Sequence, residues 1–179
     1  IQARMSSSRL PGKVLLPLQG VPLILYQLER LHQCTQIDRL VLATSNDRSD
    51  DSLAYQVDQA GVSVFRGELH DVLERFRACV AQEKPKVVVR LTGDCPLADP
   101  ALIDELVTAF HSGDWDYLTN SADEKNLTVP DGFDAEVFKA SLLERAALEA
   151  RLPSEREHVT PWMRSSQAGL RWGHYCHQP

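Results

Sequence analysis

The chain has 179 residues, of which 43% are hydrophobic and 25% charged, as in an ordinary globular protein with one core. Nineteen basic against twenty-five acidic side chains give a net charge of −6. This balance argues against general nucleic-acid binding, which needs a spread of Lys and Arg to displace counterions. No window reaches the roughly 18 consecutive apolar residues of a membrane span, and no leader pattern opens the sequence. We therefore expect a cytoplasmic protein that binds no nucleic acid and no membrane.

The charges are segregated along the chain. Residues 1–28 carry three basic side chains and no carboxylate, a local charge of +3. Residues 94–136 carry eleven Asp and Glu against the single Lys125, a local charge of −10. The net charge is almost wholly the difference between these two segments, and a small polyanion on the basic segment stays possible.

Short apolar runs alternate with longer stretches of helical periodicity. Strands are predicted at residues 37–44, 62–65 and 86–91. Helices are predicted at about residues 22–33, 50–60, 71–82 and 100–110, the last beginning after Asp99 as N-cap. Strands alternating with helices predict an α/β fold, a three-layer sandwich whose mainly parallel sheet is covered by helices on both faces.

Ligands of such sheets bind beyond the carboxyl ends of the strands, an edge that we call the rim. Three segments are expected at the rim: the loop after residues 1–3, the loop after Thr44, and Thr-Gly-Asp-Cys-Pro at residues 92–96. The basic segment and Asp94 are therefore predicted to meet there.

The basic loop, residues 4–13, has the composition of a phosphate site. Gly12 permits close approach of the backbone, hydroxyls and amides donate hydrogen bonds, Arg grips phosphate oxygens, and Lys adds a point charge. The loop is not a Walker A motif, because Ser7 and Val14 stand where that motif needs Gly and Ser or Thr. From composition alone, a solvated basic turn is an alternative of equal weight.

Residues 1–13 resemble the signature that opens the cytidylyltransferases of CMP-activated sugar acids, such as CMP-Kdo and CMP-N-acylneuraminate synthetases. They are most similar to the branch called spore coat polysaccharide biosynthesis protein F. The similarity continues in order through residues 20–23, 41–44, 71–76, 92–97, 131–138 and 157–161.

The resemblance implies a glycosyltransferase-A-like nucleotide-diphospho-sugar transferase fold and one nucleotidyltransferase domain over residues 1–179. It implies Mg²⁺-dependent transfer from CTP to a sugar or sugar acid, with pyrophosphate released and a CMP-sugar formed for surface polysaccharide biosynthesis. A homodimer is also implied. The family ordinarily continues into a Val-Asp-x-Pro-Glu-Asp-like segment with a second metal ligand, which this sequence lacks, so we expect a domain incomplete at both termini.

The resemblance also implies roles for residues at matching positions. The triphosphate would be held by Arg4, Arg9 and Lys13. The rest of the nucleotide would lie near Gln2, Ala3, Ser6, Gly12, Thr92 and Gly93. Independently of the resemblance, displacement at an α-phosphorus needs positioning and charge neutralisation, which a cationic loop provides.

Asp94 follows a strand directly and matches the family's metal-binding Asp. Mg²⁺ takes one or two carboxylates besides water and substrate phosphates, so a single Asp is a sufficient protein signal. A strand-end Asp that caps a turn is the alternative.

The acceptor sugar is expected near Asp131, Asp134, Glu136 and His158, because the resemblance places the first three in the acceptor pocket. Strand alternation puts Asp134 and Glu136 on one face, and a solvated edge strand is the alternative. His158 is predicted near the start of a helix with Ser154 as N-cap, where it either bonds the helix end or contacts the acceptor or a neighbouring subunit.

Two rival functions are open. A glycosyltransferase on the same fold would use Asp114 and Asp116 as an Asp-x-Asp metal motif, although Trp115 fits the start of a strand. A non-catalytic nucleotide-binding domain is the other, because the sequence lacks the family's second metal-binding carboxylate. The four scattered cysteines suggest neither zinc nor disulfides, and residues 174–177 are expected to be strand and tail.

Overall fold

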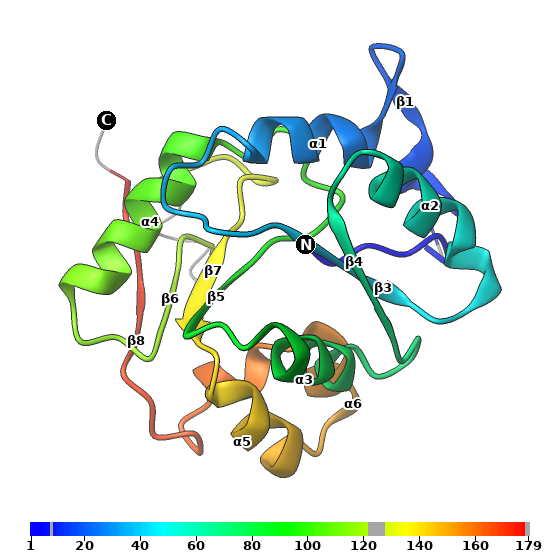
Figure 1. The fold of residues 1–179 in the computed structure, drawn as a ribbon. Helices are drawn as coiled ribbons and strands as arrows, with labels where there is room; N and C mark the ends of the chain where they lie inside the picture. The colour runs from blue at the N-terminus through cyan, green and yellow to red at the C-terminus, as the bar shows by residue number, and fades with distance from the viewer. Residues whose placement is uncertain (8, 122–127, 178–179) are drawn as a thin grey trace.

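The structure is a computed structural model that describes residues 1–7, 9–121 and 128–177. Its central layer contains two groups of strands joined by the first residues of the chain (Figure 1). One group pairs β3 (Val41–Ser45) with β4 (Ser63–Gly67) in parallel. The other has the order β5 (Val87–Arg90), β7 (Glu136–Lys139), β6 (Tyr117–Thr119) and β8 (Trp172–His174). Gln2 bridges the groups, in parallel, through Ala43 of β3 and Thr92 just beyond β5.

Strand β7 differs in direction from the other strands of the second group. It runs antiparallel to its neighbours β5 and β6, whereas β8 is parallel to β6. In the described part of the layer, β7 is thus the one strand that opposes the others. A mainly parallel sheet was predicted, and the structure confirms it. A small antiparallel hairpin of β1 (Pro17–Leu18) and β2 (Val21–Pro22) follows the basic loop.

Helices cover both faces of this layer (Figure 1). One face carries α1 (Leu23–Leu31), α2 (Asp51–Gln59) and α4 (Pro100–Ser112), which share a hydrophobic cluster with Leu42 and Val137. The other carries α3 (Val72–Glu83), α5 (Leu142–Glu149) and α6 (Pro153–His158). The short 3₁₀ helices are η1 (Lys13–Leu15), η2 (Arg48–Asp50) and η3 (Pro161–Arg164). The predicted three-layer α/β architecture is confirmed.

Local sequence explains most of these elements. In α1, Ile24, Leu28 and Leu31 recur at helical spacing and are all buried. Asp99 caps α4 as predicted, since its carboxylate accepts hydrogen bonds from the amides of Ala101 (2.8 Å) and Leu102 (3.2 Å).

Some predicted boundaries differ from the structure. The predicted strand at 37–44 begins only at Val41. The prediction for α6 was wrong: Leu152 is its N-cap, Ser154 lies inside its first turn, and His158 is its last residue. The reason is that Pro153 fits the first helical position and the Glu155 carboxylate accepts a hydrogen bond from the backbone amide of Leu152 (2.9 Å), so the helix begins earlier. In the described residues no helix combines the length and apolar character needed to span a membrane.

Candidate functional site

The first three residues occupy the centre of the sheet. The amide of Gln2 donates to the Leu91 carbonyl (2.9 Å), and the carbonyl of Gln2 accepts from the Gly93 amide (2.7 Å). A Cβ atom on Gly93 would lie 2.7 Å from Cβ of Ala3, a separation that real Cβ atoms do not show. Glycine is therefore required at position 93, because the segment that carries Asp94 passes directly against the segment that leads into the basic loop.

The basic loop and Asp94 meet at the rim, as the sequence predicted. Nζ of Lys13 lies 2.5 Å from Oδ2 of Asp94, and both side chains stay partly accessible, at 26% and 41%. Gly12, with φ of 73°, donates its amide to the Met5 carbonyl (2.8 Å), which closes the loop and turns Lys13 back toward the sheet. Burial would raise the pKa of Asp94, but the hydrogen bond from Lys13 and other local contacts hold this pKa below 3.8. Asp94 is therefore an ionised, accessible carboxylate beside a cation.

A buried carboxylate, which sequence reasoning missed, fixes the start of the basic loop. Asp50 is fully buried and accepts hydrogen bonds from the amide of Met5 (2.7 Å), the hydroxyl of Thr44 (3.0 Å) and the amide of Ser45 (3.0 Å). The hydroxyl of Ser45 donates to it as well. Asp50 thus ties the loop backbone to the end of β3. An acidic residue six positions after a predicted strand end was the available signal, but it did not predict burial.

Arg75 is a second residue that the sequence did not single out. It is fully buried, and its Nη1 donates to the Glu68 carbonyl (3.2 Å), whereas its Nε and Nη2 have no partner in the described residues. Burial lowers its pKa to about 10, against the opposing effect of Asp50. Arg75 therefore places a cation beneath the rim, near Asp50.

The remaining residues predicted in the basic loop are more exposed. Nη2 of Arg4 lies 3.7 Å from the Glu157 carboxylate, which links the loop to α6. Arg9 and Ser6 are exposed, and Ala3 is buried against Gly93. Arg4 and Lys13 are each beside a carboxylate, so an incoming polyanion would compete with Glu157 and Asp94 for these cations.

The predicted acceptor residues divide into two environments. Asp134 is half-buried, and its pKa is raised by burial and by the nearby carboxylates of Asp131, Glu136 and Asp94. Glu136 is 8% exposed and accepts hydrogen bonds from Arg90, from Tyr117 Oη (2.7 Å) and from Thr160 Oγ1 (2.5 Å). Although burial would raise its pKa, Arg90 and these hydroxyls lower it below 4.5. Asp134 thus faces the rim, while Glu136 belongs to the interior.

The carboxylates near Asp94 suit a divalent cation. Mutual repulsion contributes to the raised pKa of Asp134, and a cation would relieve it. No group of three or more His, Cys, Asp or Glu side chains in the described ranges is arranged to hold a metal by itself. Mg²⁺ does not need such a cage, because water and substrate phosphates complete its coordination. The residues present therefore fit a metal that is shared with a phosphate-bearing substrate.

His158 is exposed at the end of α6, next to an unusual turn. Val159 has φ of 71°, which is strained for a β-branched residue, and the Thr160 amide donates to the His158 carbonyl (2.8 Å). The turn separates exposed His158 from buried Thr160, which bonds Glu136. His158 therefore lies at the surface on a fixed backbone.

The Asp-Trp-Asp segment lies at the other end of the sheet. Asp116 immediately precedes β6, and it pairs with Lys139, the last residue of antiparallel β7 (2.7 Å). Both positions mark the amino ends of the parallel strands, opposite the rim. Asp114 pairs with Arg171. These two carboxylates are not brought together with the basic loop.

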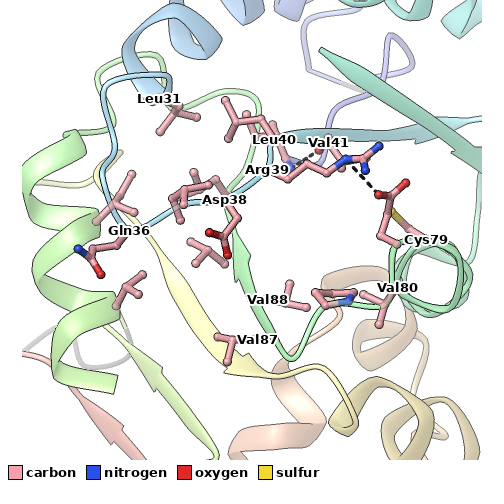
Figure 2. A pocket seen from close by; sticks show the side chains of 18 of the residues that line it. Leu31, Gln36, Asp38, Arg39, Leu40, Val41, Cys79, Val80, Val87 and Val88 are labelled. Atoms are coloured by element: carbon pink, nitrogen blue, oxygen red, sulfur yellow. Dashed lines mark hydrogen bonds and ion pairs between the residues drawn. The ribbon is translucent and has the colours of Figure 1, made fainter. Parts of the chain in front are cut away.

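A cavity of about 570 Å³ also lies away from the rim (Figure 2). It is lined largely by apolar side chains, including Val41 of β3, Val87 and Val88 of β5, and Val80 of α3. None of the predicted site residues lines it. The candidate site is therefore the open rim around Lys13 and Asp94, not this cavity.

Comparisons with known proteins agree with this geometry. A family model described as "Cytidylyltransferase" matches residues 1–178. The spore coat polysaccharide biosynthesis protein SpsF of Bacillus subtilis (strain 168) is 39% identical over 178 residues, which cover 96% of this chain and 71% of that protein. The chain thus spans only part of this relative's length.

Solved structures share the fold. A cytidylyltransferase from Leptospira borgpetersenii serovar Hardjo-bovis (strain JB197) has a TM-score of 0.92 and 35% identity, over 99% of this chain and 74% of that one. A CMP:2-keto-3-deoxy-manno-octonic acid synthetase complexed with CTP has a TM-score of 0.73 and 16% identity, over 98% and 88% of the two chains. The nucleotidyltransferase fold expected from the sequence is confirmed.

Proposed function

This chain belongs to the cytidylyltransferase family of nucleotidyltransferases, and we propose that it transfers the cytidylyl group of CTP to a hydroxyl of a sugar or sugar acid. The observation that carries the proposal is the contact between Lys13 and Asp94, which joins the basic loop to the candidate metal ligand. The products are pyrophosphate and a CMP-sugar, which we assign to surface polysaccharide biosynthesis.

The basic loop acts on the triphosphate. The acceptor hydroxyl oxygen forms a bond to the α-phosphorus, the bond from this phosphorus to the bridging oxygen of the β-phosphate breaks, and the hydroxyl proton passes to solvent. Negative charge accumulates on the leaving pyrophosphate, where Arg4, Arg9 and Lys13 neutralise it. Asp50 holds the backbone of Met5, so the start of the loop is fixed before the substrate arrives.

Asp94 is the residue that would hold Mg²⁺, with Asp131 and Asp134 beside it. When bound, the ion would supply neutralisation of the negative charge of these carboxylates and of CTP. Lys13 pairs with Asp94, so transfer of its ammonium to the triphosphate would leave this carboxylate free for the ion.

The acceptor contacts fall to Asp131, Asp134 and His158 in this proposal. The oxygens of Glu136 accept from three protein donors, so its role is to support the neighbouring residues instead of binding the sugar. A homodimer and a cytoplasmic location complete the proposal, and size-exclusion chromatography with light scattering measures the former.

Pyrophosphate release from CTP and a panel of sugars and sugar acids, with Mg²⁺ present, tests this function. We expect release with at least one panel member and its loss in Asp94→Asn. Asp114→Asn is the matched control, because this carboxylate lies at the opposite end of the sheet. Absence of both pyrophosphate release and CTP binding by calorimetry would refute the proposal, and binding without release would favour a non-catalytic nucleotide-binding domain.

A further inference from the structure

The side-chain amide of Gln2 has a defined orientation. Its Oε1 lies 2.9 Å from Nη2 of Arg90. A guanidinium has only donors, so the Gln2 atom that faces it must be the carbonyl oxygen and not the NH₂ group. The direction of this hydrogen bond therefore fixes which end of the amide points away from Arg90.

Arg90 is itself held in place by a buried network. Its Nη1 donates to Glu136, and its guanidinium lies 5.8 Å from the centre of the Phe76 ring. Glu136 also accepts from Tyr117 and Thr160, so every partner of this carboxylate is a donor. The hydrogen bonds thus run from the two hydroxyls and from Arg90 to Glu136, and from Arg90 to Gln2. No hydrogen bond of this network can change direction without leaving a buried polar group unpaired.

The consequence is a directed donor at the rim. Gln2 is half-buried between Ala43 of β3 and Thr92, beside Gly93 and the start of the basic loop. Its Nε2 makes no hydrogen bond with the described residues, although its Oε1 is occupied. Because Arg90 occupies the Oε1 atom of Gln2, a ligand that approaches the Gln2 side chain meets only the N–H groups of its amide.

We infer that Gln2 donates this hydrogen bond to an acceptor oxygen on the nucleoside half of CTP, and that Arg90 and Glu136 are the positioning residues that set its direction. The inference rests on the proposed function, since it assumes that CTP binds at the rim. The pyrimidine carbonyl and the ribose hydroxyls are the acceptors of suitable chemistry. The triphosphate is held separately, by the basic loop.

Two substitutions of Gln2 separate a donor from a space-filling side chain. Gln2→Glu keeps an oxygen for Arg90 but replaces the NH₂ group by a second acceptor. Gln2→Met removes both polar atoms at similar length. Calorimetry measures the affinity of each variant for CTP, for 2′-deoxy-CTP and for inorganic triphosphate, and thermal melting reports on the fold.

We expect CTP affinity to fall about two- to ten-fold in Gln2→Met, the value of one lost neutral hydrogen bond. In Gln2→Glu it should fall about ten- to one-hundred-fold, because an acceptor then faces an acceptor. Affinity for inorganic triphosphate should stay unchanged in Gln2→Met, and in Gln2→Glu it should fall less than the affinity for CTP, since the added carboxylate only repels the anion at a distance. The melting temperatures should not follow the order of the CTP affinities. Gln2→Glu should be at least as stable as the wild type, because the Glu carboxylate strengthens the bond to Arg90.

The deoxynucleotide identifies the acceptor. Equal losses for CTP and 2′-deoxy-CTP assign the pyrimidine carbonyl or the ribose 3′-oxygen, whereas a loss confined to CTP assigns the ribose 2′-oxygen. Both results support the inference. Equal CTP affinity in wild type and Gln2→Glu would overturn it, as would a parallel loss of triphosphate affinity in Gln2→Met. Failure of the wild type to bind CTP overturns the proposed function itself, so the two failures are distinguishable.

The double variant Arg90→Met with Glu136→Gln tests the positioning role. It removes both buried charges together, so neither is left uncompensated, and it frees the Gln2 amide to rotate. We expect CTP affinity to fall about two- to five-fold, since an unoriented amide donates only part of the time, with triphosphate affinity unchanged. Unchanged CTP affinity would exclude Arg90 and Glu136 as positioning residues.

Discussion

Two ion pairs lie near the same edge of the sheet, and their different burial gives them different roles. Lys13 and Asp94 are 26% and 41% exposed, whereas the side chains of Arg90 and Glu136 are each 10% exposed. The first pair is open to a ligand. The second is enclosed by Tyr117 and Thr160, and its arginine also donates a hydrogen bond to Gln2.

This difference shows that a charged residue near the rim does not necessarily contact a ligand. An exposed pair contributes little to stability, so its charges are free to exchange partners. A buried pair is costly to break, because the surviving charge stays in the interior. The open pair therefore suits binding and chemistry, and the closed pair suits the orientation of a neighbouring side chain.

Breaking the closed pair should give the largest effect. Arg90→Met leaves the Glu136 carboxylate uncompensated, and we expect the free energy of unfolding to fall by roughly 3–5 kcal/mol. Urea denaturation measures it. Lys139→Met, which removes the exposed partner of Asp116, is the matched control and should cost less than about 1 kcal/mol. Equal losses in the two variants would contradict the contrast.

Breaking the open pair should affect activity instead of stability. Lys13→Met removes a cation that stabilises the leaving pyrophosphate, and we expect kcat/KM to fall about 10²- to 10³-fold. The free energy of unfolding should change by less than about 1 kcal/mol. Pyrophosphate release and urea denaturation measure the two quantities. Arg39→Met, beside the remote cavity, is the control, and a comparable loss of activity there would undermine the assignment.

The neighbouring carboxylates Asp134 and Glu136 should respond to pH in opposite directions. The pKa of Asp134 is raised above 3.8 in the folded protein, so its contribution to stability is lost as pH rises through that folded value. The pKa of Glu136 is lowered below 4.5, so its contribution is lost as pH falls through its folded value.

Asp134→Asn should therefore raise the free energy of unfolding at pH 7 by up to roughly 1 kcal/mol, the scale of a partly exposed charge interaction. The gain should vanish in acid, where the wild-type carboxyl is protonated. Urea denaturation between pH 3 and 7, set against the wild type, measures it. A gain that persists unchanged at low pH would show that the charge of Asp134 is not its cause.

The smallest effect concerns Arg4. Its partner Glu157 lies 3.7 Å away and competes with phosphate for the guanidinium. Glu157→Gln should tighten CTP binding about two- to five-fold by calorimetry, the value of one exposed ion pair. Glu149→Gln removes a similar exposed partner, that of Arg145, and should leave affinity unchanged. Weaker binding in Glu157→Gln would mean that Glu157 orients Arg4 instead of competing with it.

Local pattern predicted much of this molecule. The helical periodicity of residues 23–31, the cap of Asp99 and the position of Asp94 after a strand are each written in a few neighbouring residues. The pattern failed where local signals competed, as at α6, which begins at Pro153 and not after Ser154. Alternation relates Asp134 to Glu136, but it did not predict that only the second lies within β7 and is buried.

The sequence by itself therefore determined the basic loop, the acidic rim and the alternation of strands and helices, because each depends on residues that are close along the chain. Tertiary structure alone decided that Asp50 anchors Met5, 45 positions away, and that Arg90 orients Gln2, 88 positions away. Burial and hydrogen-bond direction follow from which distant segments pack together. A local pattern carries no such information, so the same residue types became an open pair at Lys13 and a closed one at Arg90.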